Sequence, residues 1–220
     1  MRKLLSILFI AFSVSVFAQS AISEGKATTK TTMSSSNSEV NAQFAMIGDI
    51  QSVTYFKDNF SRTETANIMT GNSVNVIDGN AKEMLMYMDN PMIGKQYMKK
   101  SIVPSEDELK SVSIEKTGET KSFLGYQCSK YLGTLNKDGA KVDMEIYTTD
   151  KISAISGQTS NLGTSLNGYP LFMKMTTKQQ GIDITFTMEV TEVKAENVSS
   201  DIFNMTPPEG YKQTDNLMGM

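Results

Sequence analysis

The sequence predicts a mainly β (α+β) protein, with a curved antiparallel sheet that forms a half-barrel and a few helical segments on its concave face. Apolar and polar residues alternate strictly over long stretches, most clearly from residue 182 to 191, which is typical of half-buried strands. Turn signals recur at roughly 8–12-residue spacing, and helical periodicity is rare, a pattern typical of antiparallel sheets that curve towards a barrel.

The longest alternating stretch, residues 168–193, predicts two long antiparallel strands joined by a polar turn. Gly181 suits the turn because glycine adopts positive φ without a steric penalty. Alternation places one apolar set on each strand, and the two sets face the same way. They are Leu171, Met173 and Met175 on the first strand, and Ile182, Ile184, Phe186, Met188 and Val190 on the second.

Shorter alternating or β-branched stretches, separated by Asn, Asp and Gly turns, predict the other strands. Asp78-Gly79 is a strong hairpin signal. Residues 106–114 are ambiguous between helix and strand, and residues 156–167 form the longest predicted loop. The predicted strands are 24–33, 50–57, 60–69, 73–77, 82–88, 94–101, 123–135 and 141–148, and the helical candidates are 39–47 (a short helix or a mobile flap) and 198–204.

Residues 1–18 are predicted to be a secretory signal peptide. The chain starts with two basic residues, continues with an apolar run that is short for a transmembrane helix, and reaches small or modest residues at Val16 and Ala18. We expect cleavage after Ala18 and a single β domain over residues 19–220. The protein is therefore expected to be periplasmic or secreted, without a membrane anchor, and no cysteine at the cut marks it as a lipoprotein.

The composition argues against several classes of function. The sequence has no histidine and one cysteine, so it lacks a His-based nucleophile pair, a His-ligated zinc and an internal disulfide. Removing the two basic residues of the signal peptide leaves 19 basic and 24 acidic residues, a net charge of −5, which argues against nucleic acid as a partner. Carboxylates 106–108 are explained by a solvated helix start. We expect a non-enzymatic protein without a cofactor.

Several motifs resemble known exported families. VTYFKDNFSRTET at 53–65 and VNVIDGNAKEMLMYMDNP at 74–91 resemble periplasmic lipoprotein carriers of the LolA/LolB type. ETKSFLGYQCSKY, NGYPLFMKM and DIFNMTPPEGYK resemble an uncharacterised, exported, Met-rich bacterial family with a domain of unknown function. The resemblance implies one lipoprotein-carrier-like domain, a half-barrel around helices with an apolar cavity.

Methionines at alternate positions share a strand face, and three readings of them stay open. They can be ordinary core, because Met fills irregular gaps. They can form an adaptable surface for an acyl chain, or a Cu(I) site, since thioethers are soft ligands. The sets are Met84, Met86 and Met88; Met173 and Met175; and Met218 and Met220.

Arg62 and Cys128 each have more than one possible role. Arg62 is the only arginine outside the predicted signal peptide. It can anchor a ligand head group, latch a lid, or form an exposed cross-strand ion pair of little energetic value. Cys128 is expected in mid-strand, as an inert buried thiol or as a reactive one in an oxidising compartment.

The leading expectation is an exported, non-catalytic binding protein for a hydrophobic ligand: a lipid, an acyl chain or a lipidated peptide. A partner would then be a lipid or a lipidated protein. The alternatives are a Cu(I)-handling protein that uses Met thioethers and a structural or envelope-interaction module. The candidate ligand-binding residues are Met84, Met86, Met88, Leu171, Met173, Met175, Phe186 and Arg62.

Overall fold

A computed structural model describes residues 21–67, 71–137, 139–163 and 165–217. The predicted signal peptide and its cleavage site lie outside the described residues, and so does the Met218/Met220 set. Within the described part of the chain, no helix is long and apolar enough to cross a lipid bilayer.

The described residues form one 12-stranded sheet with the order β12-β6-β5-β4-β3-β2-β1-β11-β10-β9-β8-β7. Neighbouring strands are antiparallel, except that β12 runs parallel to β6. The sheet is open and curved, as the sequence predicts. The strands are β1 (Glu24–Ser35), β2 (Ile50–Lys57), β3 (Phe60–Asn67), β4 (Gly71–Asp78), β5 (Glu83–Asn90), β6 (Gly94–Ser101), β7 (Val112–Phe123), β8 (Tyr126–Lys137), β9 (Ala140–Thr149), β10 (Tyr169–Gln179), β11 (Ile182–Lys194) and β12 (Lys212–Gln213).

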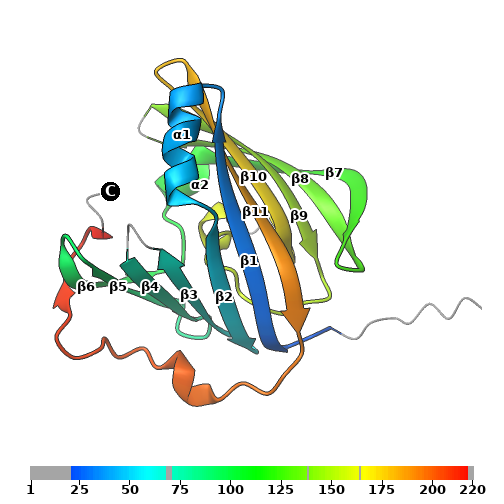
Figure 1. The fold of residues 1–220 in the computed structure, drawn as a ribbon. Helices are drawn as coiled ribbons and strands as arrows, with labels where there is room; N and C mark the ends of the chain where they lie inside the picture. The colour runs from blue at the N-terminus through cyan, green and yellow to red at the C-terminus, as the bar shows by residue number, and fades with distance from the viewer. Residues whose placement is uncertain (1–20, 68–70, 138, 164, 218–220) are drawn as a thin grey trace, which may run out of the picture.

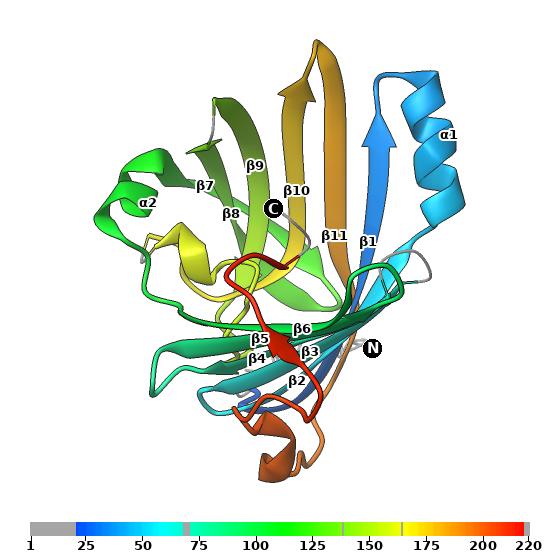
Figure 2. The same ribbon diagram turned by 90° about the vertical axis from the view of Figure 1, so that its left-hand side faces the viewer.

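The curvature divides the sheet into two halves that face each other across a concave side. We call β2 to β6 the platform, and β1 with β7 to β11 the wall. Figures 1 and 2 show the wall standing at a steep angle to the platform. The long β10–β11 hairpin lies in the wall, and its turn contains Gln180 and Gly181 with φ of 50° and 83°, the positive values that a tight hairpin turn requires.

The two α-helices cover little of the concave side. α1 (Ser38–Ile47) is capped by Asn37, whose Oδ1 accepts hydrogen bonds from two backbone N–H groups, and it packs against β1, where β1 extends beyond its pairing with β2. α2 (Glu106–Ser111) has a capping box of Ser105 and Glu108. Neither helix contains a buried residue, because α1 has a weak apolar stripe and α2 is short and charged.

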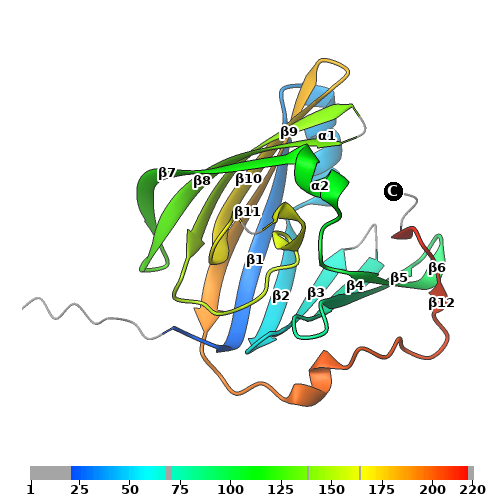
Figure 3. The same ribbon diagram turned by 180° about the vertical axis from the view of Figure 1, so that it is seen from behind.

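A loop fills part of the concave side instead. We call residues 154–167 the inner loop, and it contains the 3₁₀-helix η1 (Ser160–Leu162). Leu162 is buried against the wall, and Figure 3 shows the loop between wall and platform. The cluster beneath it combines apolar side chains from three strands of the wall: Tyr131, Met144, Ile146 and Met173.

The chain after β11 wraps around the platform. We call residues 198–217 the strap. It crosses the convex face of the platform as the 3₁₀-helix η2 (Ser200–Phe203), where the Phe203 ring lies 5.9 Å from that of Phe60. It then adds β12 to the edge of β6, and residues 215–217 reach the concave face. Figures 1 and 2 show this path in orange and red.

Candidate functional site

The candidate site lies on the concave face of the platform. Strand pairing aligns inward-facing residues from different strands in two rows across the sheet. The register of the β4–β5 hairpin is supported by Asp78, whose Oδ1 accepts hydrogen bonds from the backbone N–H of Asn80 and Ala81, each at 2.9 Å. The first row is Thr63, Asn75, Met86 and Met98, and the second is Thr65, Ser73 and Met88.

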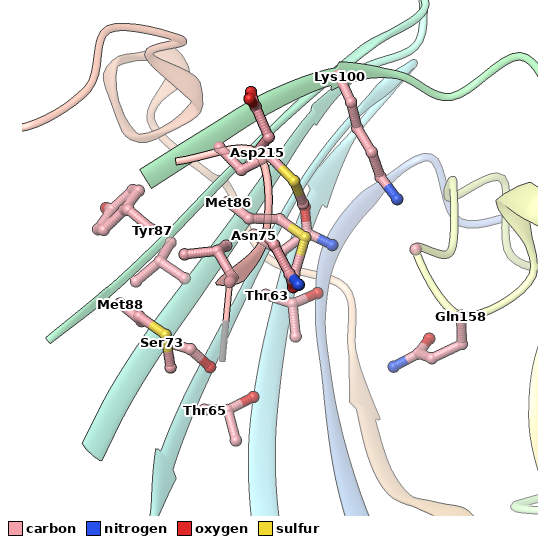
Figure 4. Close-up of a pocket in the computed structure, with 15 residues that line it drawn as sticks. Thr63, Thr65, Ser73, Asn75, Met86, Tyr87, Met88, Lys100, Gln158 and Asp215 are labelled. Carbon is pink, nitrogen blue, oxygen red and sulfur yellow. The ribbon is translucent and has the colours of Figure 1, made fainter. Parts of the chain in front are cut away.

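These two rows form the floor of a cavity of about 610 Å³, which is within the range of small-molecule sites. The inner loop contributes Gly157 and Gln158 to its lining, and the strap contributes residues 215–217. Figure 4 shows Met86, Met88 and Asn75 on the floor, with Gln158 approaching from the inner loop. The cavity is therefore built from three regions that are far apart in the sequence.

The chemistry of the lining changes across the floor. On β5 and β6, the first row presents the thioethers of Met86 and Met98. On β3 and β4, both rows present hydroxyls and an amide. The charged lining residues, Lys100 and Asp215, are exposed to solvent. The cavity thus combines an apolar side with a neutral polar side, and its charges lie where water screens them.

The structure brings some of the predicted methionines to this cavity. Met86 is half-buried and Met88 is 4% exposed, and both line the cavity. Met84 faces the same side of β5 but is 3% exposed and is not among the lining residues. Alternation therefore places all three on one face, but only two of them form the cavity.

The other predicted apolar residues lie on the concave face of the wall. Leu171 and Met173 are buried, at 0% and 1% exposure, and line only a crevice of about 10 Å³. Met175 pairs with Phe186 across β10 and β11, and both are half-buried. Gln158 lines both the crevice and the large cavity, so the inner loop lies between Leu171 and Met173 on one side and the methionines of the platform on the other.

Arg62 lies on the opposite face of the platform. Its neighbour Thr63 faces the cavity, and successive residues of a strand point to opposite sides. The Arg62 guanidinium donates to the Glu64 carboxylate at 2.6 Å and to the Ile202 carbonyl of the strap at 3.2 Å. It also lies 5.9 Å from the centroid of the Tyr87 ring. Arg62 therefore attaches the strap to the convex face, and its side chain does not reach the cavity.

Cys128 is the third residue of β8, near the start of the strand and not in its middle as the sequence predicted, and it has 0% exposure. Burial raises the pKa of its thiol to about 11. A buried thiol with a raised pKa is a poor nucleophile, because the thiolate is the reactive form. The structure thus favours the inert alternative for this residue.

Sequence reasoning did not find the polar half of the cavity. The signal for Thr63, Thr65, Ser73 and Asn75 was present, because alternation in two predicted strands puts each pair on one face. Met98 lay in a predicted strand but was not considered. The sequence predicted a loop at residues 156–167 and a helical segment at 198–204, which forms η2. No local pattern indicated that the inner loop and the strap line the cavity, because both reach it through long-range packing.

Fold and cavity together define an open, curved β-sheet protein with a candidate ligand cavity on its concave face. The chain belongs to the family described as Domain of unknown function (DUF4412), whose model matches residues 24–211.

The chain is also similar to two solved structures of PNGF-II. In space group C2 the identity is 18%, the similarity covers 86% of this chain and 30% of that chain, and the TM-score is 0.44. In space group P21 the identity is 18%, with 86% and 31% coverage and a TM-score of 0.45. The chain therefore spans less than a third of the length of these structures. No curated protein matches the sequence.

Proposed function

We propose that this protein is an exported, non-catalytic binding protein for a hydrophobic ligand, such as a lipid, an acyl chain or a lipidated peptide. The observation that carries the proposal is the convergence of Met86, Met88 and Met98 on one cavity. Unbranched thioether side chains adapt to ligands of variable shape. A flexible apolar chain is therefore the ligand type that this side of the cavity fits best.

The charged groups of the cavity favour binding over catalysis. Lys100 and Asp215 are both exposed at its opening. Acid–base catalysis uses titratable groups whose pKa is tuned by burial or by a close charged partner. Lys100 and Asp215 are exposed instead of buried, and the sequence contains no histidine.

The proposed site of action is the periplasm or the outside of the cell. The predicted signal peptide supports export, and the resemblance of residues 53–91 to periplasmic lipoprotein carriers supports a carrier role. An open curved sheet with a cavity on its concave face suits that role, because a ligand can enter and leave without unfolding of the sheet.

A fluorescent fatty acid tests the proposal. We expect the purified mature protein to bind it and Met86→Glu to weaken binding by about tenfold or more, or roughly 1.4 kcal/mol, because a charge facing an acyl chain is costly to desolvate. Met92→Glu is the matched control, since Met92 lies between β5 and β6 and is 85% exposed. The proposal fails if the wild type binds no apolar probe, or if both variants bind equally well.

A second candidate function is the handling of Cu(I). Met86 and Met98 are direct cross-strand partners, and such partners have Cβ atoms about 4.5–5.5 Å apart. Met88 lies two residues from Met86 on the same face. Within the described residues, no group of three or more His, Cys, Asp or Glu side chains could hold a metal ion, so a soft site would rest on thioethers alone.

Native mass spectrometry under reducing conditions tests this second candidate. The wild type should bind one Cu(I), and the triple variant Met86→Leu, Met88→Leu and Met98→Leu should bind none. Leucine is close to methionine in volume, so the fold should survive. Binding by the triple variant, or none by the wild type, would exclude a copper site at these residues.

A further inference from the structure

The polar side of the cavity contains a hydrogen-bond acceptor without a partner. Asn75 Oδ1 is buried and accepts no hydrogen bond from any described residue. Buried side-chain oxygens in folded proteins nearly always have a partner, and an exception calls for an explanation. Asn75 lies on the floor of the candidate site, but less than 1 Å² of its Oδ1 is accessible. A ligand that donates a hydrogen bond to this oxygen would supply the explanation once the amide turns towards the cavity.

The surroundings of Asn75 place it at the boundary between the two sides of the cavity. Strand pairing puts Thr63 on one side of it and Met86 on the other. A Cβ atom on Gly157 would lie 2.7 Å from Asn75 Nδ2, so the glycine lets the inner loop approach the amide closely. No described residue donates a hydrogen bond to Oδ1, so the amide can turn to present this oxygen to a ligand.

The other polar side chains of the two floor rows are neutral. Thr65 and Ser73 are direct partners across β3 and β4, and Gln158 faces them from the inner loop (Figure 4). Lys100 lies on β6, on the apolar side of the floor. A charged head group beside Asn75 would be desolvated without an opposite charge as a partner, which is strongly unfavourable.

We infer that the ligand is a single-chain amphiphile whose head group is uncharged and carries a hydroxyl or amide N–H donor. The head group binds between β3, β4 and the inner loop and donates to Asn75 Oδ1. The acyl chain extends over Met86 and Met98 towards Leu217 of the strap. This inference rests on the proposed function and adds the chemical class of the head group.

Three probes with the same twelve-carbon chain separate the head groups. Monolaurin carries two hydroxyl donors, methyl laurate carries no donor, and laurate is charged. We expect monolaurin to displace a fluorescent fatty acid at least about tenfold more effectively than methyl laurate, because a site with an unmet acceptor discriminates against a ligand without a donor. Laurate should bind more weakly than monolaurin at neutral pH.

Substitution at Asn75 tests the assigned contact. Asn75→Leu should reduce the affinity for monolaurin about tenfold and leave that for methyl laurate unchanged or higher. Asn72→Leu is the matched control, because Asn72 lies on the same strand and is exposed. If Asn75→Leu does not fold, as judged by urea unfolding, the double variant Thr65→Val and Ser73→Ala tests the head-group site instead. This variant should reduce the preference for monolaurin over methyl laurate.

The outcomes distinguish this inference from the proposed function. If no probe binds, the proposed function fails and the inference falls with it. If all three probes bind equally, or if the variants keep the wild-type preference, the head-group assignment is overturned and the carrier function stands. Tighter binding of laurate than of monolaurin would replace the neutral head group with an anionic one.

Discussion

At the scale of single residues, Arg62 makes three kinds of contact on the convex face of the platform. Its guanidinium contacts a carboxylate, a backbone carbonyl and an aromatic ring. The Arg62 side chain is 20% exposed, and that of Glu64 is 45% exposed. Solvent therefore screens the ion pair, and the hydrogen bond to the strap carries more of the structural role.

We predict that Arg62→Met lowers the free energy of unfolding by about 1–3 kcal/mol, the usual loss for a hydrogen bond from a charged group. The measurement is urea unfolding followed by circular dichroism. Lys110→Met is the control, because the Lys110 side chain is 72% exposed in its ion pair and should change stability by less than about 0.5 kcal/mol. The predicted anchoring role would be wrong if the two variants were equally stable.

Methionines on the same strand face also differ in depth. Met84 and Met86 both face the concave side, yet Met84 is buried and Met86 is half-exposed beside the cavity. Period-2 alternation predicts which face a side chain occupies. It cannot predict how much of that face other segments cover, because the inner loop and the strap arrive from distant parts of the chain.

At the scale of elements, Glu24 at the start of β1 holds the beginning of the strap. Its Oε1 accepts hydrogen bonds from the Val198 N–H at 2.6 Å and from Lys57 Nζ at 3.0 Å. Lys57 Nζ also donates to the Val198 carbonyl at 3.2 Å. Three segments therefore meet at one carboxylate.

The hydrogen bond from Val198, followed by that from Lys57, lowers the pKa of Glu24 below its ordinary value of 4.5. A lowered folded-state pKa adds stability at pH values above 4.5, and this contribution is lost as the pH falls through the folded-state value. We predict that acidification lowers the hydrogen-exchange protection factor of the Val198 amide more in the wild type than in Glu24→Gln, which cannot titrate. An equal decrease of the protection factor in both proteins would show that Glu24 does not control the strap.

The elements themselves show what local sequence can predict. Residues 50–57, 94–101 and 182–194 alternate or are β-rich between clear turns, and they form strands with nearly the predicted limits. β7 was missed as a separate strand because its sequence is mostly polar, and it continues directly from α2. The predicted strand 123–135 is interrupted at Leu124 and Gly125, both at positive φ.

At the scale of the whole molecule, the strap touches both faces of the platform and its outer edge. On the convex face it buries Val198 and Phe203. At the edge, β12 pairs with Gln96 and Tyr97 of β6, and the Thr214 N–H donates to the Tyr97 carbonyl at 2.9 Å. On the concave face, Leu217 is 8% exposed and lines the cavity.

Along the strap, the residues buried against the convex face come first, and the residues that line the cavity come last. The contacts of Val198 and Phe203 with the convex face precede Pro208. The Tyr211 ring, which lies 5.5 Å from that of Tyr87, follows it, as do β12 and the residues that line the cavity. A segment with few buried contacts opens more readily than the core, and such segments commonly gate binding sites. Residues 215–217 line the cavity, and we expect them to act as a cover that opens while the sheet stays folded.

We predict that a chain ending at Pro208 keeps its β-sheet circular dichroism but releases a bound fluorescent fatty acid at least about tenfold faster, since Leu217 no longer covers the ligand. Stopped-flow displacement by excess unlabelled fatty acid measures the release rate. A chain ending at Leu217 is the matched control, because it keeps β12 and the cover, and it should release the probe at the wild-type rate. Equal release from the two shortened chains would show that residues 209–217 do not cover the site, and loss of the sheet signal in the shorter chain would show that the edge contacts of β12 are required for folding.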